Sequence, residues 1–153
     1  NLPDLSIKWP NDIMSANKKI GGILIENTIK GEGTISSIVG LGLNVNQVKF
    51  ENLPRASSLA LICNTAFDKD KILFDVLSEM KKIIGDYTSK SSFLWKEYAD
   101  NLFKIGVPTV FADEKEVNFM GIIKGVSSIG KLQILLEDDS VFEYNLKEVQ
   151  MLY

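Results

Sequence analysis

The first third of the chain carries hydrophobic residues in the alternating pattern that is typical of β-strands. Leu5–Trp9 alternates over a short stretch, whereas Ile20–Glu26 and Thr34–Val45 are longer and rich in β-branched and aliphatic residues. The connecting segments, residues 10–18 and Lys30–Gly33, contain the turn-forming residues Pro, Asn, Asp and Gly. The pattern therefore predicts three strands, joined first by a loop and then by a turn.

The middle of the chain changes from alternation to helical spacing. Residues 47–57 are aperiodic and predict a loop, and Ser58–Cys63 predicts a short helix. Asp68 is placed to cap a longer helix over 69–87, whose apolar residues recur on one face. This is the most strongly patterned element of the chain.

A second long helix is expected to begin at Ser91 or Ser92 and to run to Leu102, with Phe93 among its apolar positions. The simplest interpretation of both long helices is that their apolar faces pack on a core. The single cysteine, Cys63, lies among apolar residues and is interpreted as an inert, buried side chain. No disulfide can form within the chain, because it has only one cysteine.

From Gly106 onward the chain returns to short alternating runs separated by turn-forming residues, which is typical of a small β-barrel. The class is therefore α+β, with a predicted boundary between a first domain over 1–103 and a second over 104–153. The predicted strands of the second domain are Val107–Phe111, Glu116–Ile123, Lys131–Leu136, Val141–Tyr144 and Lys147–Leu152.

Composition and charge narrow the range of functions. The 153 residues are 45% hydrophobic and 24% charged, with a net charge of -3. This charge balance gives no excess of basic residues that would bind nucleic acid. No apolar run reaches the roughly 20 residues that span a bilayer. We therefore expect a cytoplasmic protein without a membrane or a nucleic-acid partner. Because the chain has no histidine, it cannot contain a Ser-His-Asp or Cys-His system or a histidine-bearing zinc site.

The segment Lys8–Asp12, followed by Lys18–Leu24, places amides, a carboxylate and lysines on a loop between two predicted strands. Such a loop can face a ligand pocket. By strict alternation Lys19 shares a face with Gly21, whereas Gly22 and Leu24 lie on the opposite face. An ordinary interpretation is equally open at this point, since most lysines are solvated surface charges and Asp or Asn after Pro commonly caps a turn.

In the third predicted strand Gly40, Gly42, Asn44 and Asn46 share one face. Two missing side chains at alternate positions leave a slot lined by backbone and ended by an amide, and Asn44 can both donate and accept hydrogen bonds, as recognition of an adenine edge requires. Alternatively, the glycines only accommodate a neighbouring helix or a bulge. The pattern alone leaves both interpretations open.

Three segments together resemble the signature of the biotin protein ligases: Lys8–Asp12, Lys19–Leu24 and Gly40–Asn46. Their order and spacing agree with that family, and Arg55–Leu59 is similar to a following family segment. The resemblance implies part of a class II synthetase-like catalytic sheet with helices, followed by an SH3-like barrel. It implies an ATP-dependent ligase that converts biotin to biotinyl-5′-AMP and then transfers it to a lysine of a biotin carboxyl carrier protein.

Carried over residue by residue, the resemblance makes Lys19 the lysine that contacts the biotin carboxyl group and the α-phosphate of ATP. A fixed ammonium there offsets the repulsion between two anions. Asp12 matches a carboxylate near the acceptor lysine, where it orients that amine or removes its proton. ATP and biotin are the implied substrates, with Mg²⁺. No metal-ligand set is assigned, and a Mg²⁺ contact is the lower-ranked role of Asp12.

The resemblance also implies two groups of binding residues. Besides Lys19, the residues that it implies for biotin binding are Gly22, Gly40 and Gly42, whose backbone lies beside biotin, and Leu24, which forms an apolar wall. Besides Lys19, the residues that it implies for binding ATP and the adenylate are Lys8, Trp9, Asn11, Leu43 and Asn44.

The chain departs from the family pattern upstream of Lys8, where these ligases carry a Gly-Arg-rich loop and residues that bind the ureido ring of biotin. Because the first residue is Asn and a strand follows almost at once, we expect a piece of a longer enzyme that is inactive by itself. An open sheet edge would favour a homodimer. The alternatives are a lipoate protein ligase-like acyl-adenylate transferase and a non-catalytic binding module.

Overall fold

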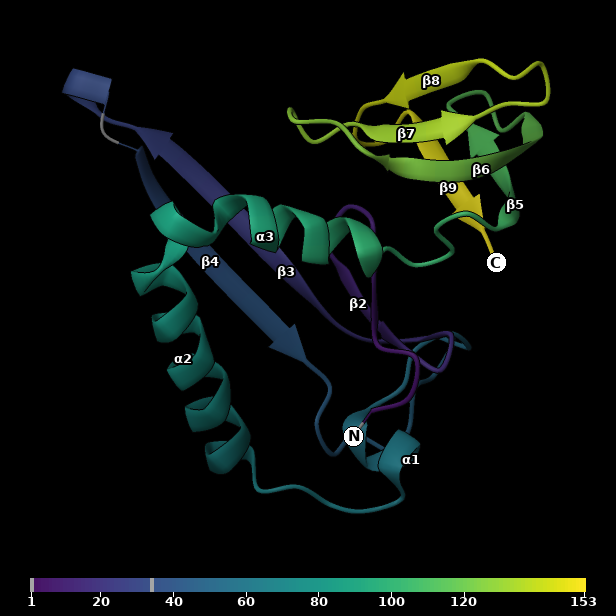
Figure 1. The fold of residues 1–153 in the computed structure, drawn as a ribbon. Helices are drawn as coiled ribbons and strands as arrows, with labels where there is room; N and C mark the ends of the chain where they lie inside the picture. Colours follow the sequence, from purple (N-terminus) through teal and green to yellow (C-terminus); the bar gives the residue numbers. More distant parts are fainter. Residues whose placement is uncertain (1, 34) are drawn as a thin grey trace. The chain divides into compact units, whose positions relative to one another are not determined.

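The computed structural model describes residues 2–33 and 35–153 (Figure 1). The chain divides into two compact units, described here one at a time. The first unit contains the residues up to Ile7 together with Asn11–Ser91, and the second contains Lys8–Pro10 together with Ser92–Tyr153. This division lies inside a helix, whereas the sequence predicts a boundary after residue 103, so the domain limits stay a prediction.

The first unit is built on a four-stranded sheet in the order β1-β2-β3-β4. Its strands are β1 (Ser6–Lys8), β2 (Asp12–Ser15), β3 (Lys18–Ile29) and β4 (Ile35–Leu43), and β2-β3 and β3-β4 pair antiparallel. The prediction of a loop over 10–18 is wrong for β2. Ala16 and Asn17 adopt φ values of 46° and 59°, as in the two-residue turn that joins paired strands, so main-chain pairing with β3 makes this stretch extended.

β3 and β4 form a long hairpin (Figure 1), and at its closed end β3 runs to Ile29, three residues beyond the predicted strand. Register is maintained from Gly21↔Leu43 to Ile29↔Ile35, and a short 3₁₀ turn, η1 (Gly31–Gly33), lies at the tip. Thr34, where the predicted third strand begins, lies outside the described residues. β4 ends at Leu43, two residues before the predicted end.

Of the three α-helices in the described residues, two are capped as their sequences indicate. The Ser58 hydroxyl accepts a hydrogen bond from the Leu61 amide at the start of α1 (Leu59–Cys63). The Asp68 carboxylate accepts hydrogen bonds from the amides of Asp70 and Lys71 at the start of α2 (Lys69–Gly85). α3 (Tyr87–Asp100) begins earlier than predicted, directly after the end of α2.

The expectation that the long helices pack on a core is wrong for α2, in which no residue is buried. Leu73 is 57% exposed and Phe74 is 72% exposed. Cys63 is only half-buried, so it is not the fully buried side chain that the sequence suggests. Helical periodicity defines an apolar face, but it does not state what covers that face.

The second unit holds a five-stranded antiparallel sheet in the order β8-β7-β6-β5-β9. Its strands are β5 (Pro108–Asp113), β6 (Asn118–Val126), β7 (Leu132–Leu135), β8 (Val141–Tyr144) and β9 (Val149–Leu152). Phe111, Ile123 and Ile134 form its fully buried centre. The five predicted runs are therefore strands and the α+β class is confirmed, although no pairing between described residues closes β8 onto β9.

Among the helices of the described residues, none combines the length and the apolar character needed to span a bilayer.

Candidate active site

A pocket of about 420 Å³ lies on the first unit where β2, β3 and β4 meet. Its polar side chains are Asn11, Asp12 and Lys19, and the remaining lining consists of glycines and aliphatic residues. The structure thus brings together seven of the residues that the family resemblance implicates, together with two others. The complete lining is Asn11, Asp12, Lys19, Gly22, Ile23, Leu24, Gly40, Leu41 and Gly42.

Lys19 and Asp12 form an ion pair at the polar side of this pocket. The Lys19 Nζ lies 2.5 Å from the Asp12 Oδ1, with side-chain exposures of 46% and 18%. The Lys19 main chain is held on both sides, because its amide donates to the Arg55 carbonyl and its carbonyl accepts from the Ser57 amide, each at 2.8 Å. The ammonium therefore projects from a fixed backbone, and only the flexible side chain has to move when an anion enters.

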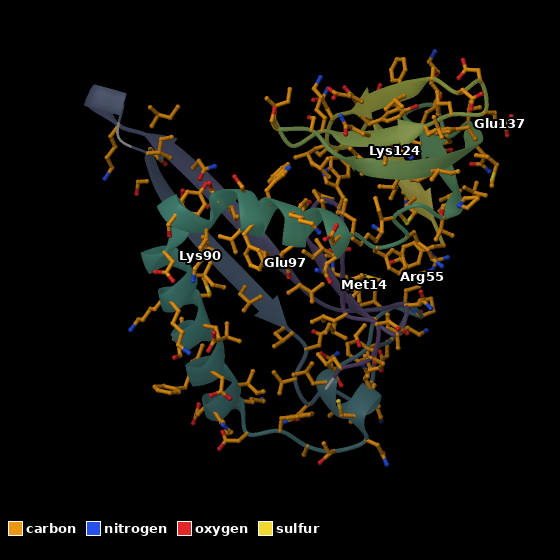
Figure 2. All side chains as sticks on the ribbon, in the orientation of Figure 1. Met14, Arg55, Lys90, Glu97, Lys124 and Glu137 are labelled. Atoms are coloured by element: carbon orange, nitrogen blue, oxygen red, sulfur yellow. The ribbon has the colours of Figure 1, made fainter. Side chains whose placement is uncertain are left out.

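The backbone that holds Lys19 is itself positioned by Asn44. The Asn44 side-chain amide donates to the Ser57 carbonyl at 3.0 Å, and its main-chain amide donates to the Ile20 carbonyl at 2.8 Å. Ile20 is buried, as is Met14, the strand partner of Lys19. Figure 2 labels Met14 and Arg55 at this end of the sheet. Asn44 therefore connects the end of β4 to the segment that fixes Lys19.

The glycines of the pocket differ in what a side chain would meet. A Cβ atom on Gly21 would lie 2.5 Å from the Gly42 carbonyl oxygen, so packing alone requires glycine there. On Gly40 and Gly42 the nearest atoms would be 3.8 and 4.0 Å away, which is ordinary contact. Neither a helix nor a bulge of the described residues presses on these two positions, so packing does not require glycine there.

Lys19 and Gly22 lie close together, although strict alternation assigns them to opposite faces. The Lys19 Cε would be 3.9 Å from a Cβ atom on Gly22, and the Asp12 Oδ1 would be 3.6 Å from it. The register of β2 and β3 shifts between Ile13 and Met14, and the long lysine side chain turns towards Asp12. Alternation is therefore a poor guide to a long side chain beside a bulge.

Four implicated residues do not line this pocket. Leu43 and Asn44 follow the glycine-bearing part of β4, and Asn44 is engaged with Ser57. Lys8 and Trp9 belong to the second unit, where the Trp9 Nε1 donates to the Gly130 carbonyl at 3.0 Å and the Lys8 Nζ lies 5.4 Å from the centre of the Tyr153 ring.

Ile23 and Leu41 line the pocket but were not predicted. They are strand partners between the pairs Gly22↔Gly42 and Leu24↔Gly40. Because side chains alternate along a strand, those of Ile23 and Leu41 point to the other face, and the neighbouring glycines leave their main chain accessible. The glycine pattern could have identified them, because each residue lies between two slot positions on its own strand and the two strands pair in the hairpin.

The donor set of the site does not form a metal cage. In the described part of the chain, no three His, Cys, Asp or Glu side chains gather closely enough to hold an ion. The Asp12 carboxylate also lies against the Lys19 ammonium. Among the residues that line the pocket, Asp12 is the one carboxylate available to a Mg²⁺ ion.

Comparison with known proteins agrees with this geometry. The model of the Biotin/lipoate A/B protein ligase family matches residues 3–44, which include Lys19 and all the other residues that line the pocket. Over this segment the chain is therefore similar to the biotin/lipoate protein ligases.

Individual relatives narrow the group. The bifunctional ligase/repressor BirA of Bacillus subtilis is 34% identical over 101 residues, covering 61% of this chain and 31% of the relative. The biotin–[acetyl-CoA-carboxylase] ligase of Mycobacterium tuberculosis is 27% identical over 129 residues, covering 84% of this chain and 47% of the relative. The chain thus spans less than half the length of these proteins.

Solved structures support the same assignment. The apo biotin protein ligase of Aquifex aeolicus superposes with a TM-score of 0.74 at 26% identity, covering 97% of this chain and 65% of that one. The same enzyme in complex with biotin and ATP gives the same TM-score and identity. The resemblance to the biotin protein ligases is confirmed.

Proposed function

We propose that this chain is part of an ATP-dependent biotin protein ligase that forms biotinyl-5′-AMP and transfers biotin to a lysine of a biotin carboxyl carrier protein in the cytoplasm. The observation that carries the proposal is the Lys19 ammonium, held against Asp12 at the polar side of an open, glycine-lined slot. The names of the relatives and the biotin and ATP complex of the Aquifex enzyme support it.

In the first step a biotin carboxylate oxygen attacks the α-phosphorus of ATP, the bond to the bridging oxygen breaks, and pyrophosphate leaves. Two anions must approach each other, so a cation at the meeting point lowers the barrier. Lys19 supplies this charge from a pinned backbone. When the phosphate arrives, the ammonium exchanges the Asp12 carboxylate for phosphate oxygens, and Mg²⁺ accompanies the nucleotide.

The slot suits the apolar part of biotin. Gly22 and Gly42 are strand partners, as are Leu24 and Gly40, so the two pairs present one continuous strip with a single aliphatic side chain. An extended acyl chain can lie along the open backbone of Gly40 and Gly42, with its carboxyl group towards Lys19 and Leu24 as the wall.

In the second step the amine of the acceptor lysine attacks the acyl carbon of the mixed anhydride, and AMP leaves. The amine must first lose a proton, and Asp12, displaced from Lys19 by the phosphate, is the nearest carboxylate in the pocket to accept it. Asn11 lies in the same pocket and is our candidate for contact with the adenylate, whereas Asn44 is better supported as a positioning residue.

We further propose that this chain makes no biotinyl-adenylate by itself. The three polar side chains of the pocket are Asn11, Asp12 and Lys19, which suit the carboxyl and phosphate groups. A ureido ring has hydrogen-bonding groups that need polar partners, and the glycine and aliphatic lining of the slot has no polar side chain to offer.

To test the proposal, the chain is titrated with biotinyl-5′-AMP, and binding is measured by isothermal titration calorimetry and by changes in the amide chemical shifts. We expect saturable binding with shifts at Lys19, Gly22, Gly40 and Gly42, and a loss of affinity on the order of 10²-fold in Lys19→Ala, where one fixed charge partner of the phosphate is removed. Lys18→Ala is the matched control, because the Lys18 Nζ binds the Pro54 carbonyl outside the pocket.

Unchanged binding in Lys19→Ala would refute the site and favour a non-catalytic binding module. Tighter binding of lipoyl-5′-AMP than of biotinyl-5′-AMP would favour the lipoate ligase alternative, which the name of the matching family also covers. Release of pyrophosphate from ATP by the chain with biotin would refute only its proposed inactivity.

A further inference from the structure

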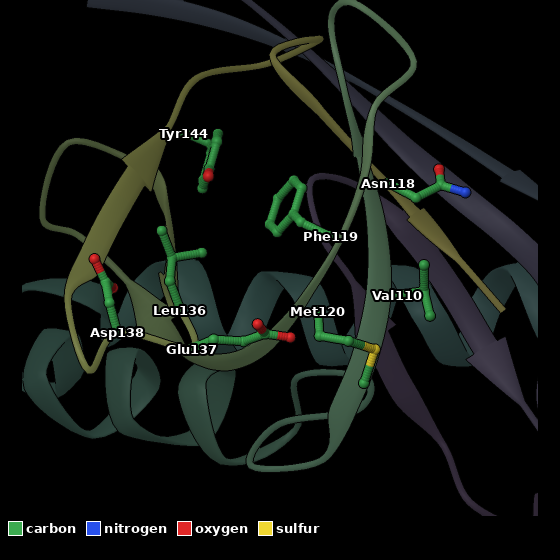
Figure 3. Close-up of a pocket in the computed structure, with 8 residues that line it drawn as sticks. All are labelled: Val110, Asn118, Phe119, Met120, Leu136, Glu137, Asp138 and Tyr144. Carbon is green, nitrogen blue, oxygen red and sulfur yellow. The ribbon is translucent and has the colours of Figure 1, made fainter.

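A second pocket, of about 540 Å³, lies on the second unit and takes no part in the proposed reaction. It is formed by β5, β6, the β7–β8 turn and β8, and its lining includes Val110, Phe119, Met120, Leu136, Glu137 and Tyr144. Figure 3 shows the Phe119 ring near the centre of this pocket, with Leu136 and Tyr144 facing it.

The two aromatic rings that line this pocket, Phe119 and Tyr144, belong to a longer row of rings. Phe119 stacks between the buried Phe111 and Tyr144, with ring centres 5.6 and 5.9 Å apart and interplanar angles of 22° and 20°. Phe142 continues the row beside Tyr144 and is 57% exposed. Rings held by a core in this way offer apolar contact without losing conformational entropy on binding.

The rim of the same pocket is acidic. Glu137 and Asp138 line it, and its lining contains no lysine or arginine. The Asp138 carboxylate accepts hydrogen bonds from the amide and the hydroxyl of Ser140, which lower its pKa and keep it charged. The pKa of Tyr144 is raised by burial and, to a smaller extent, by the nearby Asp113 carboxylate.

The charge imbalance belongs to this unit as a whole. It carries ten carboxylate side chains and seven lysines, whereas the first unit carries ten of each sign, so the net charge of -3 lies on the second unit. An apolar pocket surrounded by negative charge favours ligands that carry positive charge.

We propose that this pocket docks an extended segment of a partner protein in which an arginine or lysine lies next to a leucine-sized residue. The apolar side chain fills the space between Phe119, Met120 and Leu136. The cationic head group lies over the Tyr144 ring and pairs with Glu137, combining cation–π attraction with a charge pair. The proposal rests on the second unit alone and does not depend on the proposed ligase activity.

The experiment uses a fluorescein-labelled peptide with the central sequence Leu-Arg-Leu between Gly and Ser residues, titrated with the whole chain and followed by anisotropy. We expect saturable binding tighter than about 1 mM, weakened about tenfold when glutamine replaces the peptide arginine. Raising the salt concentration should weaken it further, because the rim charges are exposed.

Two variants locate the site. Glu137→Lys should weaken binding about tenfold, because reversal turns an attraction into a repulsion, and Met120→Ser should weaken it about fivefold through lost apolar contact. Met120 is 39% exposed, so its replacement leaves the fold intact, which circular dichroism checks. Glu97→Lys on α3 is the matched control for the same change of net charge outside the pocket.

Absence of saturable binding would overturn the proposal. So would equal weakening by Glu97→Lys and Glu137→Lys, which would show attraction to the charge of the unit rather than docking in the pocket. A Glu137→Lys chain that binds the peptide as the unchanged chain does would overturn it as well.

Discussion

The Lys19 ammonium on β3 and the Asp12 carboxylate on β2 lie 2.5 Å apart. The two residues are not strand partners, and the register of β2 and β3 shifts between them. Lys19 remains 46% exposed, so solvent screens the pair and it contributes less than about 1 kcal/mol to stability. The ion pair matters because it fixes the position of the Lys19 ammonium at one end of the slot, whose lining has no other positive side chain.

Replacing Asp12 should strengthen the binding of biotinyl-5′-AMP with little effect on stability. Asp12→Asn removes a negative charge beside the expected phosphate, so we predict that biotinyl-5′-AMP binds roughly twofold to fivefold more tightly, while the free energy of unfolding changes by less than about 1 kcal/mol. Calorimetry and urea denaturation measure the two effects. Binding weakened as severely as in Lys19→Ala would show instead that Asp12 is needed to aim the lysine.

Adding methyl groups to the slot should abolish binding without unfolding the sheet. Gly40 and Gly42 have room for a Cβ atom and do not adopt positive φ, so alanine at either position should stabilise the chain by about 0.4–1 kcal/mol. The methyl group would nevertheless occupy the space proposed for the acyl chain. Binding of biotinyl-5′-AMP should therefore be lost in a stable protein.

Gly21→Ala is the contrasting variant of that series. Its Cβ atom would meet a main-chain oxygen at 2.5 Å, so the backbone has to shift, at a cost of about 1–3 kcal/mol. Thermal denaturation of the three alanine variants distinguishes these cases. Equal destabilisation by all three would mean that Gly40 and Gly42 are also required by packing.

Asn44 should affect Lys19 through the main chain. Asn44→Ala leaves the Ser57 carbonyl without its side-chain donor, so we expect a loss of about 1–2 kcal/mol and faster hydrogen exchange at the amides of Lys19 and Ser57. Asn46→Ala is a matched control, because the Asn46 amide makes two hydrogen bonds to the Phe67 main chain. The control should be destabilised without faster exchange at Lys19.

Acid should weaken the turn before β9. Hydrogen bonds from the Asn145 side chain and amide lower the pKa of Glu148 in the folded chain. A lowered folded-state pKa means stability that is present above the unfolded-state pKa and is lost as pH falls through the folded-state value. The melting temperature of the unchanged chain should therefore fall more between neutral pH and pH of about 3 than that of Glu148→Gln.

Local patterns predicted many of the individual elements. Alternation located the strands of the second unit, and Ser58 and Asp68 marked the starts of α1 and α2 because a cap requires only a few consecutive residues. The family-like segments also identified Lys19, Asp12 and the glycines of β3 and β4 as candidates, and these residues do line one pocket.

Packing between distant segments decided what these patterns could not. β2 exists because β3 supplies its hydrogen-bond partners, and Lys19 lies beside Gly22 because of an irregular register that no periodicity reveals. Whether a glycine is required by packing, as Gly21 is, or leaves open space, as Gly40 does, depends on atoms far along the chain. Sequence periodicity specifies which face of an element is apolar, but only the tertiary contacts specify what that face meets, and the exposed face of α2 shows the difference.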